Sequence, residues 1–79
     1  MNILVEFELG GKTISLPYST SDKIKKGDEE SAFMAICTVL STIKQKAGNV
    51  TIHNLKIHFN GQTVFEKSEY RILNYTPAL

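Results

Sequence analysis

Two histidines, one cysteine and a short run of hydroxyl residues are the groups in this chain that could do chemistry. His53 and His58 are five residues apart, and a regular strand would point them to opposite faces. No second cysteine or clustered carboxylate follows them in sequence to complete a four-ligand metal set. We therefore expect exposed strand histidines, no metal site and no cofactor.

The candidate nucleophiles lack the neighbours that would activate them. Cys37 falls at the edge of an apolar helical stripe, where a cysteine is usually a small buried hydrophobe, and no local Cys-His signature accompanies it. Ser19, Thr20 and Ser21 carry no nucleophile-elbow motif, and Gly10-Gly11 matches no phosphate-binding loop. We expect no catalytic residue and a chain that is not an enzyme.

Basic and aromatic residues allow a binding surface. The basic segment is Lys23, Lys25 and Lys26, and an open sheet face could add Lys56, His58, Lys67 and Arg71. Stacking groups there would be Phe65, Tyr70 and Tyr75. A sheet that binds single-stranded nucleic acid uses this arrangement. The net charge of only +1 favours a solvated loop and ordinary strand surface instead.

Length and composition indicate one small globular domain over residues 1–79. The chain is 42% hydrophobic and 22% charged, which is ordinary for a globular protein. No apolar run approaches the roughly 18 residues that a membrane helix needs, and the N-terminus has a strand pattern rather than that of a secretory signal. These features predict a cytoplasmic protein without a membrane partner.

The elements that must position these residues begin with a hairpin. Apolar residues alternate with polar ones over 2–9, and Gly10-Gly11 supplies a two-residue turn. That turn would pair Phe7 with Ile14, Val5 with Leu16 and Ile3 with Tyr18. A polar loop over 19–27 should follow.

A helix is predicted from about Glu29 to Ala47, with Asp28 as N-cap and Gly48 in the left-handed position after its end. Met34 should point away from the apolar face and be partly exposed. The stripe expected to pack on the sheet is Phe33, Ile36, Leu40, Ile43 and Ala47, widened by Ala32, Cys37 and Val39.

The second half of the chain predicts another hairpin. Its apolar phase flips near His53-Asn54, which indicates a bulge or kink, and Asn60-Gly61 favours a type I′ turn. A strict two-residue loop pairs Ile57 with Val64, whereas a three-residue bulged loop pairs Ile57 with Phe65. Both remain open, and residues 70–75 could form a last short strand or turn.

The fold class is therefore α+β: hairpin, helix, hairpin (ββαββ, with or without a short fifth strand), as one sheet with a single helix packed on one face. Part of the start of the chain resembles the first hairpin and helix lead-in of ubiquitin: Met1, Ile3, Val5, Gly11-Lys12-Thr13-Ile14, Leu16, Ser21-Asp22 and Ile24. The resemblance implies a β-grasp fold and protein binding through the sheet face. The chain ends Thr76-Pro77-Ala78-Leu79 without a terminal Gly-Gly, so covalent conjugation is not implied.

Three functions follow from this shape. The leading hypothesis is a small non-enzymatic protein-binding domain, an inhibitor or modulator of a larger complex of the kind that phages and mobile elements encode against host defence, acting by surface occlusion. The alternatives are single-stranded nucleic-acid binding on the open sheet face and a structural subunit of a homo-oligomer such as a homodimer. The binding residues expected are Lys56, His58, Phe65, Tyr70 and Tyr75 on the open face, with Lys23, Lys25 and Lys26 in the loop.

Overall fold

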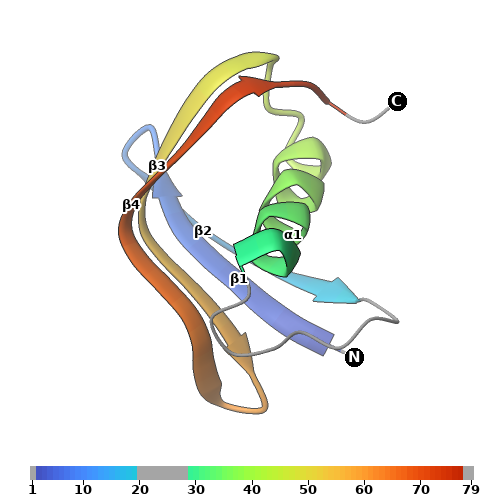
Figure 1. Ribbon diagram of the computed structural model, residues 1–79, viewed down its shortest axis with the longest axis vertical. Coiled ribbons are helices and arrows are strands. Elements are labelled where there is room, and N and C mark those ends of the chain that lie inside the picture. The colour runs from blue at the N-terminus through green and yellow to red at the C-terminus, as the bar shows by residue number, and fades with distance from the viewer. Residues whose placement is uncertain (1, 20–28, 78–79) are drawn as a thin grey trace.

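A computed structural model of the chain describes residues 2–19 and 29–77 as one antiparallel four-stranded sheet with a helix across one face (Figure 1). The strands lie in the order β2-β1-β3-β4, so β2 and β4 form the two edges. This arrangement confirms the α+β class and the ββαββ order. Residues 70–75 continue the last strand and form no fifth strand within the described ranges. The elements are β1 (Asn2–Leu9), β2 (Lys12–Ser19), α1 (Glu29–Thr42), β3 (Gly48–Phe59) and β4 (Gln62–Tyr75).

The first hairpin has the predicted register. Gly10 and Gly11 have φ values of +59° and +80°, which are the left-handed values that both central residues of a type I′ turn require. Ile3 pairs with Tyr18, Val5 with Leu16 and Phe7 with Ile14, as predicted from the turn length and the apolar alternation.

The second hairpin combines features of the two predicted alternatives. Asn60-Gly61 forms a two-residue turn with φ values of +53° and +78°, and His58 pairs with Thr63. The register then shifts, so that Ile57 pairs with Phe65 and Val64 is the extra residue of a bulge. The pairing predicted for the longer loop is therefore reached through a short turn followed by a bulge.

The predicted phase change in β3 is confirmed at Asn54, which has a left-handed φ of +52°. Glu6 of β1 pairs with Lys56, whereas Glu8 pairs with His53, so β3 has one extra residue in this interval. An extra residue reverses which side chains face the helix. Strand β3 can therefore bury residues at even positions before Asn54 and at odd positions after it, namely Val50, Ile52, Leu55 and Ile57.

Helix α1 ends at Thr42, five residues before the predicted end. Lys44, with φ of +61°, takes the left-handed position that was predicted for Gly48. The Lys44 amide donates to Ser41 O (3.1 Å) and the Gln45 amide to Leu40 O (2.9 Å), which is the bonding of a Schellman motif. Thr42 and Ile43 are β-branched, and such residues have low helix propensity. The predicted N-cap at Asp28 lies outside the described residues, as does nearly all of the predicted loop.

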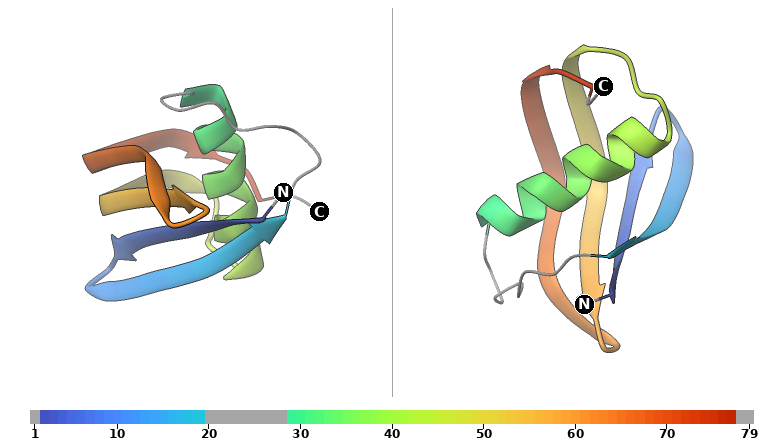
Figure 2. Two further views of the ribbon diagram at one scale, coloured as in Figure 1. Left: turned by 90° about the horizontal axis from the view of Figure 1, so that it is seen from below. Right: turned by 90° about the vertical axis from the view of Figure 1, so that its right-hand side faces the viewer.

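The core lies between α1 and the inward side of the sheet, which the helix crosses diagonally (Figure 2, right). Two of the buried helix residues, Ala32 and Ala35, are small, which lets the helix approach the strands closely. The predicted burial of Phe33 is wrong: its side chain is 43% exposed, because the buried stripe is rotated away from it. Met34 is 57% exposed, as predicted. The residues that α1 buries are Ala32, Ala35, Ile36, Val39 and Leu40.

The sheet bends around the helix. A straight strand of 14 residues such as β4 would be about 45 Å long. The longest dimension of the molecule is 30 Å, so β4 must bend along its length. Figure 1 shows β3 and β4 curving together toward α1. Their register shifts, at Val64 and near Asn74 (φ +54°), supply the local twist that such a bend requires.

Candidate binding surface

The sheet face opposite α1 carries three cross-strand rows of mainly polar residues. Directly paired residues share a face, so the registers define these rows. The described part of this face carries four glutamates but only two Lys or Arg residues, Lys56 and Arg71. Glutamates therefore outnumber Lys and Arg there, with the histidines left out of the count. The rows are Thr63, His58, Leu4 and Pro17; then Glu66, Lys56, Glu6 and Ser15; then Glu69, His53, Glu8 and Thr13.

The aromatic residues expected on this outer face lie elsewhere. Phe65 (9% exposed) and Tyr75 (3% exposed) belong to the core under α1, so their assignment to the open face is wrong. The bulge at Val64 turns Phe65 inward, and a second register shift near Asn74 turns Tyr75 inward. Tyr70 pairs with the buried Ile52 and is half-buried on the helix side, in edge-to-face contact with Phe65.

The basic residues are also divided. Lys56 and His58 lie on the outer face as expected, and Arg71 pairs with Glu69 there (2.9 Å). Lys67 lies instead on the helix side, since it pairs with the buried Leu55, and its ammonium contacts Glu29 of α1 (3.1 Å). The other expected basic residues, Lys23, Lys25 and Lys26, lie outside the described residues. Support for single-stranded nucleic-acid binding on the outer face therefore falls, because that face lacks the expected stacking groups and has an acidic balance.

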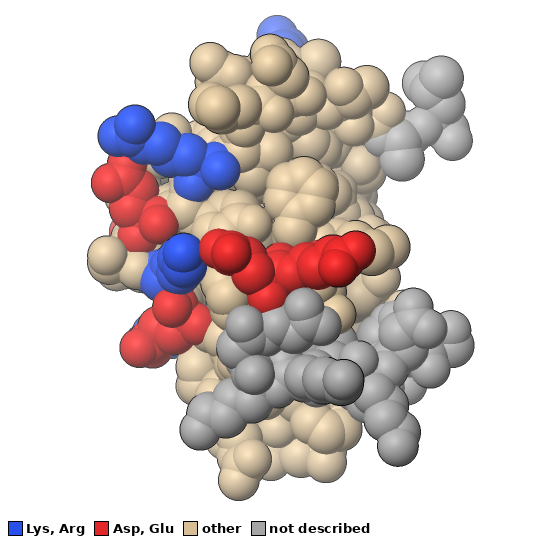
Figure 3. Space-filling view, viewed as in Figure 1, with Lys and Arg blue, Asp and Glu red and all other residues tan. Residues whose placement is uncertain are grey.

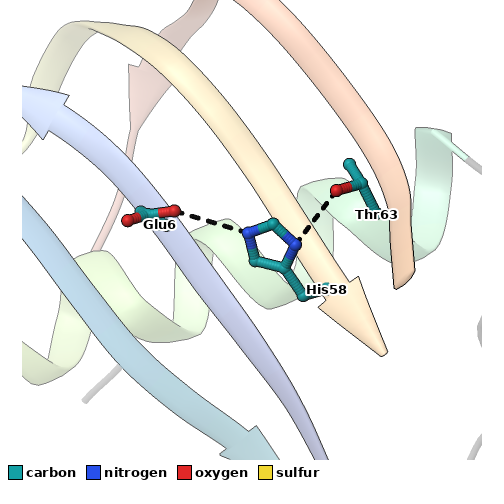
Figure 4. Close-up of polar contacts among 3 residues, drawn as sticks. All are labelled: Glu6, His58 and Thr63. Carbon is teal, nitrogen blue, oxygen red and sulfur yellow. Dashed lines mark hydrogen bonds and ion pairs between the residues drawn. The ribbon is translucent and has the colours of Figure 1, made fainter. Parts of the chain in front are cut away.

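His58 is held from both sides by neighbours on the outer face (Figure 4). Its Nε2 lies 3.4 Å from Glu6 Oε1 and its Nδ1 lies 3.1 Å from Thr63 Oγ1. The tautomer that fits both contacts has Nε2–H donating to the Glu6 carboxylate and Nδ1 accepting from the Thr63 hydroxyl. The contacts join β1, β3 and β4 and fix the orientation of the imidazole.

The order hydroxyl, imidazole, carboxylate is that of a nucleophilic triad, but among the described residues the hollow beside Glu6 does not reach the hydroxyl. Acyl transfer also requires hydrogen-bond donors aimed at a developing oxyanion and a place for the substrate beside the hydroxyl. The shallow hollow of about 240 Å³ beside Glu6 is lined by Phe7, Glu8, Thr13, Asn54 and Lys56, and by neither His58 nor Thr63. We interpret the three residues as a cross-strand brace.

The two histidines share the outer face, because the extra residue at Asn54 reverses the phase between them. The expectation that a regular strand would separate them therefore does not apply. The row of Lys56 lies between the two histidines. In the described ranges, no group of three or more His, Cys, Asp or Glu side chains could hold a metal ion.

The solvent side of α1 differs in kind from the sheet face. Beyond the exposed Glu29 and Glu30 of the first turn, no charged residue occurs until Lys44, so the rest of the helix turns only uncharged side chains to solvent. On α1 the large exposed hydrophobic side chains are Phe33 and Met34, and Cys37, one helical turn further along, is half-buried. Figure 3 shows charged side chains along the β4 margin and in one acidic band, and an uncharged area directly above that band. We call Phe33, Met34, Cys37, Thr38, Ser41 and Thr42 the α1 face.

A hollow of about 350 Å³ continues the α1 face toward the end of the chain. It is lined by Cys37, Thr38, Ser41, Thr42 and Thr76, so it is uncharged as well. Burial raises the pKa of the Cys37 thiol, which keeps the thiol protonated and poorly nucleophilic near neutral pH. The hollow therefore offers hydroxyl groups and apolar surface rather than a reactive group.

Sequence reasoning missed the α1 face because it assigned Phe33 to the core. The available signal was the absence of charge on every side of the predicted helix from Ser31 to Ile43. A surface helix of a globular protein normally carries charged or strongly polar residues on its solvent side. A helix without them has a second surface that is suited to contact with another molecule.

Comparisons with protein-family models, with curated proteins and with solved structures give no match to the chain. The resemblance of the first hairpin to ubiquitin thus stays a prediction. What is established is the class of fold, an α+β domain with one helix on an open antiparallel sheet. Among the described residues, no helix is long and apolar enough to cross a membrane.

Proposed function

We propose that the chain is a non-enzymatic protein-binding domain that uses the α1 face to occlude a surface of its partner. The observation that carries the proposal is the combination of exposed Phe33 and Met34 with the absence of charged residues on the α1 face. Interface cores are depleted in charged residues and enriched in aromatic residues and methionine. The proposal keeps the class of function expected from the sequence and moves the contact from the sheet to the helix.

The partner surface expected is apolar at its centre and charged at both ends. Glu29 and Glu30 lie in the first turn of α1, and Lys44 and Lys46 follow its last turn. A complementary partner would place basic groups near the first turn and acidic groups near the last, and these rim charges would set orientation more than affinity. An inhibitor of a larger complex needs only such a contact, because occlusion requires no chemistry.

A charge placed on the α1 face tests the proposal. Met34→Lys puts an ammonium at the centre of the face, and the new lysine lies four residues after Glu30, a spacing that stabilises a helix by about 0.2–0.5 kcal/mol. The variant should therefore fold as well as the unmodified chain, which circular dichroism and thermal unfolding would check. The matched control is Lys56→Glu on the sheet face, which reverses a charge in the binding set predicted from the sequence.

The readout is capture of partners from lysate by the tagged chain, with nuclease-treated and high-salt-washed samples analysed by mass spectrometry. We expect a discrete protein that survives both treatments, is retained by Lys56→Glu and is lost by Met34→Lys. A protein lost only by Lys56→Glu would return the site to the sheet and overturn the α1 assignment. Recovery that disappears with nuclease or salt would favour nucleic-acid binding.

A further inference from the structure

The two free edges of the sheet differ in how they are protected. Edge strands resist pairing with other chains when they carry charges and bulges. β4 has both, since Glu66, Lys67, Glu69 and Arg71 are exposed along it and register shifts occur near each of its ends. β2 has no charged residue from Thr13 to Ser19, and in the described ranges it pairs with β1 alone.

The turn of the first hairpin determines which backbone groups of β2 face the free edge. In a hairpin with a two-residue turn the residues flanking the turn, here Leu9 and Lys12, form a hydrogen-bonded pair, and bonded and non-bonded pairs alternate from there. Thr13, Ser15 and Pro17 therefore fall in non-bonded pairs, with their N–H and C=O positions directed away from β1. Figure 2 (left) shows β2 at the margin of the sheet.

Pro17 restricts what this edge can bind. Proline has no N–H, so its place in a non-bonded pair with Leu4 costs the hairpin no hydrogen bond but removes one donor from the free edge. An incoming strand can form complete pairs only with the part of β2 before Pro17. Before Pro17, two residues direct both an N–H donor and a C=O acceptor away from β1: Thr13 and Ser15.

We propose that a second copy of this chain occupies the β2 edge, pairing antiparallel about a two-fold axis at Ile14. In this register Thr13 of one copy forms a hydrogen-bonded pair with Ser15 of the other, twice by symmetry, and Pro17 opposes no residue of the other β2. The dimer would join two four-stranded sheets into one sheet of eight strands.

The side chains of β2 suit its own reversed sequence in this register. Ile14 meets Ile14 of the other copy, and Lys12 lies opposite Leu16, along which its aliphatic stem can pack. Thr13 opposes Ser15, a polar pair without charge on the outer side. No like charges face each other. Ile14 and Leu16 are both only partly buried in the single copy, so pairing covers apolar surface that the hairpin leaves open.

Cysteine scanning tests the dimer and its register together. In the background of Cys37→Ser, the variants Ile14→Cys, Ser15→Cys and Leu16→Cys are oxidised mildly and analysed on non-reducing gels, with Thr51→Cys on the central strand β3 as the matched control. A non-hydrogen-bonded pair at the two-fold has Cα atoms about 4.5 Å apart, which is within disulfide range. We expect Ile14→Cys to give the cross-linked dimer.

Each outcome decides one part of the proposal. Cross-linking strongest at Ser15→Cys or Leu16→Cys would overturn the register set by Pro17. If none of the three β2 variants cross-links more than Thr51→Cys does, the proposed dimer is wrong. These positions lie outside the α1 face, so either result leaves the test of partner binding by Met34→Lys unaffected.

Sedimentation of the unmodified chain provides a second measurement. The overlap is short and buries less than the roughly 1,200 Å² of a standard stable interface, so we expect a reversible dimer that forms between micromolar and millimolar concentration. Ser15→Pro removes a second donor from the free edge without removing a bond to β1, and it should remain monomeric with unchanged circular dichroism. An unmodified chain that stays monomeric at millimolar concentration would also overturn the dimer.

Discussion

The Ser41 hydroxyl on α1 lies 2.8 Å from the Tyr75 hydroxyl at the end of β4. This contact joins the last turn of the helix to the last residue of the sheet, 34 positions apart in sequence. Because the ring of Tyr75 is also buried, the residue contributes both packing and a hydrogen bond. Its part in the fold is structural, whereas the sequence pattern predicts a place for Tyr75 on a binding surface.

Tyr75→Phe should lower the free energy of unfolding by about 1 kcal/mol, the typical net value of one hydrogen bond. Urea denaturation measures the change. Ser41→Ala and the double variant complete a cycle in which the second substitution adds less than it does alone. Additive effects of the two substitutions would show that the two hydroxyls do not interact in solution.

Phe65→Ala should destabilise the fold by about 3–5 kcal/mol, since it deletes a buried aromatic ring. His58→Ala removes a side chain that is 25% exposed on the outer face and should cost no more than about 1 kcal/mol. Thermal unfolding of the two variants compares the core side with the outer side of the same hairpin. Equal losses would mean that Phe65 is not in the core.

Lys44→Gly should stabilise the protein by about 0.5–1 kcal/mol. Lys44 has a left-handed φ of +61°, which strains a residue with a side chain, and glycine removes that strain at some cost in unfolded-state entropy. Lys44→Ala is the control, because it removes the same charge and keeps the strain. A glycine variant no more stable than the alanine variant would contradict this account of the helix end.

The stability of the fold should decline at alkaline pH partly through Tyr70. Burial raises the pKa of the Tyr70 phenol above its ordinary value, and the nearby charge of Glu29 and the Cys37 side chain add to the effect. The folded chain therefore holds this proton more tightly than the unfolded chain. Stability from this group is complete below the ordinary pKa of tyrosine, about 10, and is lost as pH rises through the raised value.

Tyr70→Phe should accordingly show a smaller loss of stability than the unmodified chain between neutral pH and a pH above the ordinary tyrosine value. Urea unfolding at the two pH values gives the comparison, with Tyr18→Phe, on the edge strand β2, as the control. An identical pH dependence of Tyr70→Phe and the unmodified chain would exclude a contribution from Tyr70.

Cys37 should react slowly with iodoacetamide at neutral pH in the folded protein. Burial raises the pKa of its thiol, so the reactive thiolate is scarce, and the rate should rise as the pH increases. The same chain in concentrated urea supplies the reference rate. Equal rates in the folded and unfolded chain would show that the thiol is open to solvent.

The sequence predicted the parts of the fold that depend on local rules. The register of the first hairpin, the turn at Asn60-Gly61, the phase change at Asn54 and the exposure of Met34 follow from turn chemistry and periodicity, whereas two registers stayed open for the second hairpin. The end of α1 did not, because Lys44 takes a backbone conformation for which the nearest glycine, Gly48, was the better candidate by propensity.

The candidate site was less predictable than the fold, because one residue of register decides the face of every side chain after it. The bulge at Val64 places Phe65 in the core, and the shift near Asn74 does the same for Tyr75. Neither position carries a glycine or proline that would have signalled an irregular strand. Lys56 and His58 precede both shifts and lie on the face that was expected for them.

The bend of β3 and β4 around α1 gives the two sides of the sheet opposite curvature. The side facing the helix is concave and filled by the core, so the outer side is convex along these strands. A convex surface meets a flat partner over a small central area, and its distant residues, such as Thr63 and Arg71, cannot contact a rigid planar target together. Shape therefore limits the outer side to small contacts or to a partner that is itself hollow, whereas a helix presents a ridge that fits a groove.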